Sequence, residues 1–244
     1  MAAQRRALVT GGSGALGAAL CWRLARAGHF VYVHAHRQAA AAEQLVAALR
    51  AEGGAAEPLI FDVTDGAGSR AVLEALLEAA PAPIQILINN AGVHEDAVFP
   101  GMAPEQWHRV ISVSVDGFYN VTQPLILPMI RSRWGRIVNI SSVSALIGNR
   151  GQVNYAAAKG ARNAATRALS LEVASRGITV NAVAPGILSS GMGAAAFDAA
   201  TIKERVPMKR AGSAEEVASL VGYLVSEEAG YLTGQVISVS GGIA

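Results

Sequence analysis

Residues 7–17 read Ala7-Leu8-Val9-Thr10-Gly11-Gly12-Ser13-Gly14-Ala15-Leu16-Gly17, and a helical pattern follows from Ala18 to about Ala27. The apolar run at the start is of the buried-strand type. Strand, glycine-rich turn and helix in this order are the context that makes a dinucleotide-binding fingerprint credible. The glycines let the backbone approach a pyrophosphate, and the helix N-terminus offers free N–H groups. The simpler alternative is an ordinary tight turn between a strand and a helix.

Apolar runs and helical patterns alternate over the rest of the chain. Six further strands are expected at residues 30–33, 59–61, 84–88, 135–140, 178–183 and 235–239. A fully apolar strand such as 84–88 is typical of a parallel sheet that is buried on both faces. We therefore predict an α/β fold, a Rossmann-type doubly wound parallel sheet of about seven strands with helices on both faces. Residues 1–244 are expected to form one domain.

Two segments of the predicted fold have features of their own. A long helix is expected from Pro104 toward Arg131, and Pro124 and Pro128 must kink or subdivide it. Residues 187–210 contain no clear strand, with a start rich in glycine and alanine and a basic end, which is typical of a mobile lid over a site.

Composition excludes several classes of protein. The chain is 52% hydrophobic and 16% charged, which suits a large core and not a disordered chain. A net charge of +2 without a polybasic run gives no reason to expect a nucleic-acid partner. The single cysteine, Cys21, fits a reducing compartment. No signal peptide, membrane span or metal site is expected, so we predict a cytoplasmic protein.

The candidate catalytic residues are Ser142, Tyr155 and Lys159. Tyr155 and Lys159 are four residues apart in a predicted helix over 153–175, so both side chains point from one face. An ammonium so close to a phenol favours the phenolate, which predicts a lowered pKa for Tyr155 and a proton donor near neutral pH. Ser142 follows a strand and can offer its hydroxyl to the same substrate oxygen. The alternative is a helix surface that carries one tyrosine and one lysine.

Polar residues at other strand ends suggest where a cofactor binds. The second strand ends in His34, His36 and Arg37 in place of the acidic residue of NAD-selective sites, and an arginine can bind a 2′-phosphate, which favours NADP. A solvated basic loop is the alternative. Asp62 can bond an adenine amine or cap the helix that starts near residue 67. Residues 89–92 can hold a ring or join neighbouring strands.

By these residues the chain resembles the short-chain dehydrogenase/reductase family over essentially its whole length. The matching signatures occur in the family's order: Thr10-Gly11 to Gly17, Asn89-Asn90-Ala91-Gly92, Ser142, Tyr155 with Lys159, and Pro185-Gly186. Within the family the chain looks most like the 3-oxoacyl-[acyl-carrier-protein] reductases, through runs 154–159, 176–186 and 232–242. The resemblance implies NADPH-dependent reduction of a 3-oxoacyl thioester carried by acyl carrier protein or CoA, in a homotetramer, with NADH the less suitable cofactor.

The resemblance also implies a role for each site residue. Tyr155 would be the general acid, Lys159 would lower its pKa and bind the nicotinamide ribose, and Ser142 would orient the carbonyl. Arg133 and Arg176 match the positions that dock the acidic carrier protein, although plain surface arginines are the alternative. The implied cofactor contacts are Gly11, Ser13, Gly14, Ala15, Leu16, Gly17, Arg37, Asp62, Val63, Asn89, Ala91, Gly92, Tyr155, Lys159, Pro185, Gly186, Ile187 and Ser190.

Several positions depart from the family pattern, and three of them bear on the site. Ser114 stands where the catalytic tetrad has an asparagine that helps to hold a water in the proton relay to the lysine, a task that a serine hydroxyl could still perform. Gly14 stands where many NADPH-dependent members have a basic residue, which leaves Arg37 as the main candidate for binding the phosphate. Ala15 replaces the second fingerprint glycine.

Two other functions are compatible with the sequence. The same catalytic residues could act on another secondary alcohol or ketone, such as a sugar or a steroid, with residues 187–210 shaping that choice. The protein could also bind the cofactor without turnover. The complete set of Ser142, Tyr155 and Lys159 argues against that second alternative, because a binding module has no need of it.

Overall fold

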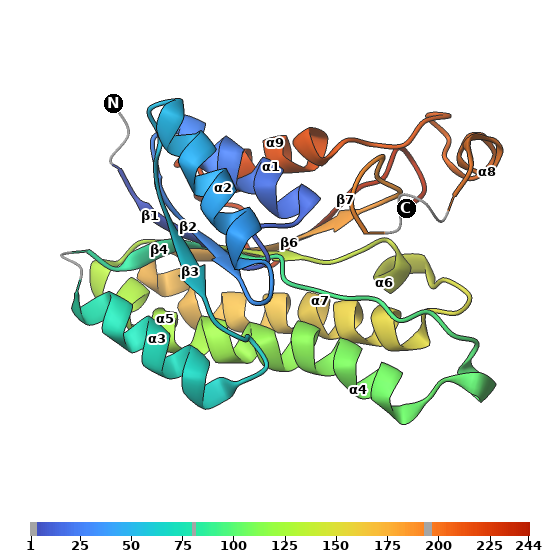
Figure 1. The fold of residues 1–244 in the computed structure, drawn as a ribbon, viewed down its shortest axis with the longest axis horizontal. Helices are drawn as coiled ribbons and strands as arrows, with labels where there is room; N and C mark the ends of the chain where they lie inside the picture. The colour runs from blue at the N-terminus through green and yellow to red at the C-terminus, as the bar shows by residue number, and fades with distance from the viewer. Residues whose placement is uncertain (1–3, 80–81, 193–196) are drawn as a thin grey trace.

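The fold is built around one seven-stranded parallel sheet. The structure is a computed structural model that describes residues 4–79, 82–192 and 197–244 (Figure 1). The strand order is β3-β2-β1-β4-β5-β6-β7, and every strand pair is parallel. The strands are β1 (Arg6–Val9), β2 (Phe30–Ala35), β3 (Ala55–Ile60), β4 (Ile84–Asn89), β5 (Gly135–Ile140), β6 (Ile178–Pro185) and β7 (Val236–Val239). The Rossmann-type doubly wound sheet is thus confirmed.

Helices cover both faces of the sheet (Figure 1). One layer holds α1 (Ala15–Arg26), α2 (Ala39–Ala51) and α9 (Ala214–Leu224), and the other holds α3 (Gly66–Glu78), α4 (Pro104–Ile111), α5 (Gly117–Ser132) and α7 (Val153–Val173). Neighbouring residues of one strand enter opposite cores, as Leu8 and Val9 do. Burial on both faces explains why the strands are apolar throughout.

The long helix expected from Pro104 is divided, but not at its prolines. A π-helical turn over Ser112–Asp116 separates α4 from α5, and Pro124 and Pro128 both lie inside α5. Gly117 opens α5 against Val63, where a Cβ would come within 2.9 Å of the valine side chain. Such turns often occur at functional sites.

The third strand differs from the sequence prediction, and the segment 187–210 contains a helix. The expected third strand covered only 59–61, whereas β3 runs over Ala55–Ile60 and pairs with β2 along its length. Pro58 is tolerated there because β3 lies at the sheet edge. The segment 187–210 contains a helix, α8 (Ala199–Arg205), and its residues 193–196 lie outside the described residues.

The predicted cap of the last helix is confirmed. Ser213 caps α9 as a capping box, since its hydroxyl accepts the Glu216 N–H at 3.2 Å. The short helix α6 (Ser144–Ile147) follows β5. None of the helices in the described ranges has both the length and the apolar character that crossing a membrane requires.

Candidate active site

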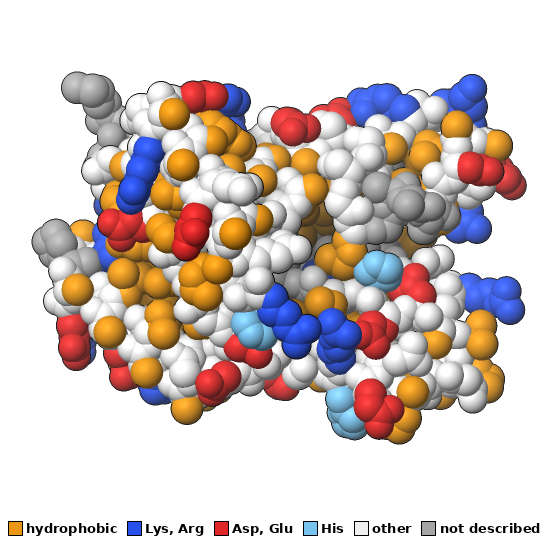
Figure 2. Space-filling model, viewed as in Figure 1, with side chains coloured by type: hydrophobic (Ala, Val, Ile, Leu, Met, Phe, Trp, Pro, Cys, Tyr) orange, Lys and Arg blue, Asp and Glu red, His pale blue; other side chains and the backbone are white. Residues whose placement is uncertain are grey.

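A large cleft lies at the carboxyl ends of the strands. Its volume is about 1430 Å³, and it is lined by residues that follow β1 to β6. Figure 2 shows a hollow on one face of the molecule, with histidine and basic side chains at its rim. Open α/β sheets bind their ligands at this edge, beside the point where the strand order reverses between β1 and β4.

The turn between β1 and α1 fits a pyrophosphate. Gly11 has a left-handed φ of 62°, and a Cβ on Gly17 would overlap the Gly11 carbonyl oxygen. Helix α1 begins at Ala15, and Gly14 before it supplies no side-chain cap. Within the described part of the chain, the first N–H groups of α1 therefore have neither intrahelical partners nor a side-chain cap, and they can bind an anion in the cleft.

His34 holds this turn in place, a role that the sequence did not reveal. Its Nδ1 accepts the Gly11 N–H at 3.0 Å, and its Nε2 lies 3.0 Å from the Phe61 carbonyl oxygen. The partners require a neutral imidazole that carries its proton on Nε2. Burial lowers the pKa of His34 to about 4, so the neutral form persists at neutral pH.

Charged residues line the end of the cleft near β2 and β3. His36, Arg37 and Asp62 all line it, and the His36 Nδ1 lies 3.6 Å from an Asp62 oxygen. The alternative that Asp62 caps α3 is wrong, because the cap is Asp65, which accepts the Gly68 N–H at 3.0 Å. Asp62 instead accepts the Thr64 N–H and hydroxyl at 2.9 and 2.8 Å.

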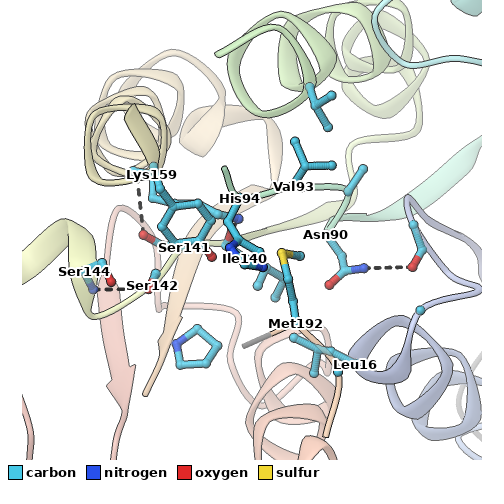
Figure 3. A pocket seen from close by; sticks show the side chains of 18 of the residues that line it. Leu16, Asn90, Val93, His94, Ile140, Ser141, Ser142, Ser144, Lys159 and Met192 are labelled. Atoms are coloured by element: carbon cyan, nitrogen blue, oxygen red, sulfur yellow. Dashed lines mark hydrogen bonds between the residues drawn. The ribbon is translucent and has the colours of Figure 1, made fainter. Parts of the chain in front are cut away.

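The two asparagines after β4 have different roles. Asn89 is buried outside the cleft lining, and its amide donates to Thr122 and Asn139 at 3.0 and 2.9 Å. It therefore joins neighbouring elements, one of the two roles that the sequence left open. Asn90 does line the cleft, and its amide donates to the carbonyls of Thr10 and Gly11 (Figure 3). The sequence reasoning missed it as a separate site residue.

The candidate catalytic residues meet in the cleft. Ser142 follows β5, and Tyr155 and Lys159 project from α7 into the same space. The Lys159 Nζ lies 5.5 Å from the centre of the Tyr155 ring and donates to the Ile140 carbonyl at 2.8 Å. Figure 3 shows Lys159 and Ser142 together on one side of the cleft, with Asn90 and Leu16 on the other.

The electrostatics of Tyr155 differ from the prediction. Burial raises the pKa of the phenol, while Arg162 and the Ser142 hydroxyl oppose the rise. The expected lowering of this pKa by Lys159 is therefore wrong in direction. Lys159 is itself buried, and burial together with Arg162 lowers the pKa of its ammonium well below the usual value. The cation that favours the phenolate is thus Arg162.

A chain of polar side chains continues from Ser142 to the outer wall of the cleft. The Ser142 hydroxyl accepts the Ser144 N–H at 3.1 Å, and the Ser144 hydroxyl donates to Gln152 at 2.9 Å. The Gln152 amide then donates to Asp96 at 3.0 Å, and the His94 Nδ1 lies 3.2 Å from the same carboxylate. Sequence reasoning missed these groups, which position Ser142 on the substrate side.

Most of the other predicted site residues line the cleft. Every implied cofactor position does so except Asn89. Ser114 does not, because it is buried in the π-helical turn. Its hydroxyl has no hydrogen-bond partner within the described ranges.

Arg133 and Arg176 lie at the opposite edge of the sheet. Arg133 ends α5 before β5, and Arg176 precedes β6, so both mark the amino ends of their strands. Six residues of β5 separate this edge from the cleft, roughly 20 Å at about 3.3 Å per residue. Both arginines are exposed, and their loops meet where the Gly135 N–H donates to the Gly177 carbonyl.

Comparison with known proteins agrees with this geometry. The pattern of the family described as short chain dehydrogenase matches residues 5–201. The chain is 44% identical to a 3-oxoacyl-[acyl-carrier-protein] reductase FabG of Aggregatibacter actinomycetemcomitans, over 97% of this chain and 98% of the relative. It is 41% identical to an acetoacetyl-CoA reductase of Rhizobium meliloti and 40% identical to a nodulation protein G of Azospirillum brasilense, over 98% of each chain. The chain therefore belongs to the short-chain dehydrogenase family of NAD(P)-dependent oxidoreductases.

Proposed function

We propose that this protein reduces a 3-oxoacyl thioester to the 3-hydroxyacyl thioester with NADPH. The observation that carries the proposal is the meeting of Ser142, Tyr155 and Lys159 in the cleft that holds the pyrophosphate-binding turn. Relatives along the full length have names that specify 3-oxoacyl-[acyl-carrier-protein] and acetoacetyl-CoA reduction, which supports this substrate class.

The protein's contribution to the reaction is position and a proton. When bound, the dinucleotide supplies a hydride to the ketone carbon. Ser142 donates a hydrogen bond to the ketone oxygen, and the Ser144 N–H fixes the direction of its hydroxyl. Tyr155 gives that oxygen its proton. Lys159 is held by the Ile140 carbonyl and faces the tyrosine ring, where it orients the ribose and the phenol.

Arg37 supports the choice of NADPH. It lies at the rim of the cleft beyond β2, where a 2′-phosphate would be reached, and no acidic residue follows β2 at this point. A guanidinium binds phosphate through paired hydrogen bonds.

Arg133 and Arg176 support an acidic carrier protein as the source of the substrate. Both arginines lie at the edge of the sheet opposite the cleft of the same chain. A carrier docked on them would deliver its acyl chain to the cleft of a neighbouring subunit, as a homotetramer would allow.

Initial rates with acetoacetyl-CoA and with a carrier-bound 3-oxoacyl chain, each with NADPH or NADH, test the proposal. We expect NADPH oxidation with both thioesters and a preference for NADPH over NADH. Replacing both Arg133 and Arg176 by alanine should raise KM for the carrier-bound substrate and leave KM for acetoacetyl-CoA unchanged. Turnover of sugar or steroid ketones without turnover of either thioester would overturn the proposal.

A further inference from the structure

A buried arginine lies directly beneath the catalytic pair. Arg162 is on α7, three residues after Lys159, and its side chain is 2% exposed. It forms no ion pair with any carboxylate in the described part of the chain. A buried cation without an anion is costly unless its donors are satisfied, so this arginine calls for an explanation.

Backbone carbonyls satisfy the guanidinium on all sides. Nε donates to Ser114 at 2.7 Å, and Nη2 donates to Ala91 at 2.7 Å. Nη1 donates to Asn89 at 3.0 Å and to Ile140 at 3.1 Å. A planar fork of donors suits such a cluster, whereas a lysine ammonium, a compact point charge, cannot reach all four oxygens at once.

These carbonyls belong to the elements that shape the active site. Asn89 and Ile140 are the last residues of the two central strands β4 and β5, and Ala91 lines the cleft. Ser114 lies in the π-helical turn and contributes only its carbonyl, since its hydroxyl makes no hydrogen bond within the described ranges. One side chain thus fastens the turn to both strand ends.

Lys159 depends on the same group of atoms. Its Nζ donates to the Ile140 carbonyl, which also accepts from Arg162. A change at Arg162 therefore moves the acceptor that holds Lys159, and it also changes the charge beside Tyr155.

We propose that Arg162 is a positioning residue that fixes the Lys159 ammonium through the shared Ile140 carbonyl and keeps a positive charge beside the Tyr155–Lys159 pair at neutral pH. The effect of this charge on the pKa of Tyr155 has a sign that can be measured. Burial and Asp96 raise the pKa of Tyr155, while Arg162 and the Ser142 hydroxyl lower it. Lys159 also faces the ring, with its Nζ 5.5 Å from the ring centre. Removal of the guanidinium should therefore raise the pKa of Tyr155.

Two substitutions separate the charge from the geometry. Arg162→Met removes both, whereas Arg162→Lys keeps a positive charge and loses the fork. Arg167→Met is the matched control, because Arg167 is exposed on the same helix. The first measurement is a pH titration of tyrosinate by ultraviolet absorbance, each protein minus its Tyr155→Phe counterpart. This readout needs no substrate, so its result is independent of the proposed function.

We expect the Tyr155 titration to move to higher pH in Arg162→Met and to stay near wild type in Arg162→Lys. With acetoacetyl-CoA and NADPH, a kinetic arm that rests on the proposed function, kcat should fall in both variants on the order of 10²-fold. The dissociation constant for NADPH should change little, and the Arg167→Met variant should match wild type in every measurement.

Several outcomes would overturn this role. One is an unshifted Tyr155 titration in a folded Arg162→Met protein. Another is wild-type kcat in Arg162→Lys. If Arg162→Met does not fold while Arg162→Lys keeps wild-type kcat and titration, the arginine serves the fold alone.

Discussion

Tyr155 is the residue on which the proposed chemistry depends, and its surroundings have opposing effects on the pKa of its phenol. Burial raises the pKa of the phenol, which keeps it protonated and suits a proton donor. Lys159 and Arg162 follow it on α7 and share the Ile140 carbonyl. Because burial weakens the lysine as a cation, the fixed positive charge near the tyrosine comes from the arginine.

Tyr155→Phe should lower kcat by about 10²- to 10⁴-fold, the usual contribution of a general acid. The ring remains, so packing and NADPH binding should be nearly unchanged. Steady-state rates and a fluorescence titration with NADPH check both parts. Tyr231→Phe is the control, because Tyr231 is fully exposed and outside the cleft lining. Activity of Tyr155→Phe within a few-fold of wild type would exclude the tyrosine as proton donor.

Arg37→Ala should remove the preference for NADPH. A hydrogen bond to a charged group contributes roughly 1.5–3 kcal/mol, so kcat/KM with NADPH should fall about 10-fold or more while the value with NADH stays. The measurement is the ratio of the two kcat/KM values. The control is Arg167→Ala, because Arg167 is exposed on α7, far from β2. An unchanged ratio would mean that another group selects the cofactor.

The sequence predicted the site residues that belong to a short spacing motif. It did not predict those that bind backbone groups far away in the sequence. Ser142, Tyr155 and Lys159 lie where their spacing predicted. Arg162 and His34 bind carbonyls that are far away in sequence, as Arg162 does with Asn89, 73 residues before it. The one available signal for Arg162 was a lone arginine in a run of small residues, one turn after Lys159.

At the scale of elements, the β1–α1 turn is held by a histidine that must stay neutral. The pKa of His34 is about 4 in the folded protein and 6.5 without burial, so the unfolded chain binds more protons between these values. The contribution of neutral His34 to the free energy of unfolding is therefore fully present above pH 6.5, and it is lost as the pH falls toward 4. The difference between these two pKa values corresponds to at most about 3.4 kcal/mol.

His34→Asn should flatten the pH dependence of stability, because an amide can accept from Gly11 and donate to Phe61 without titrating. We expect the free energy of unfolding, measured in urea, to drop less between pH 7 and pH 5 in this variant than in wild type. His108→Asn, at an exposed position, serves as the control and should keep the wild-type dependence. Equal drops in wild type and His34→Asn would contradict a buried neutral His34.

Element boundaries were predictable where hydrophobic pattern alone sets them. β5 was predicted at its observed bounds because it is buried on both faces. β3 was predicted too short because its first residues, Ala55 to Pro58, have no strand pattern and depend on pairing with β2. The π-helical turn is set by tertiary contacts, including the Arg162 bond to Ser114 and the close approach of Gly117 to Val63. No helical period in the sequence predicts it.

At the scale of the whole molecule, the sheet separates two surfaces. The cleft lies at the carboxyl edge, and Arg133 and Arg176 lie at the amino edge. This placement was predictable from the sequence, because each arginine lies two residues before the start of a predicted strand. The length of β5, roughly 20 Å, separates these two surfaces within one chain. We therefore propose that a docked carrier serves the cleft of a neighbouring subunit, which links the carrier proposal to the oligomer proposal.

Exposed apolar residues on the outer helices are the candidate contacts of the proposed homotetramer. Large apolar side chains are exposed on α5, at Tyr119 and Leu127, and on α7, at Val153 and Leu171. Leu171 is 84% exposed, which is unfavourable for a leucine in water. A homotetramer related by two-fold axes would bury one such face against its own copy.

Light scattering after gel filtration should give about 100 kDa, four times the chain mass of 25.1 kDa. Leu127→Lys with Leu171→Lys should reduce this mass, because burying two ammonium groups in an apolar interface is costly. Tyr231→Lys changes an equally exposed apolar residue outside α5 and α7 and should leave the mass unchanged. If the smaller species keeps its KM for acetoacetyl-CoA and loses its low KM for the carrier-bound substrate, docking and catalysis belong to different subunits. A wild-type mass near 25 kDa would exclude the tetramer, and with it the delivery of substrate from the arginines of one chain to the cleft of another.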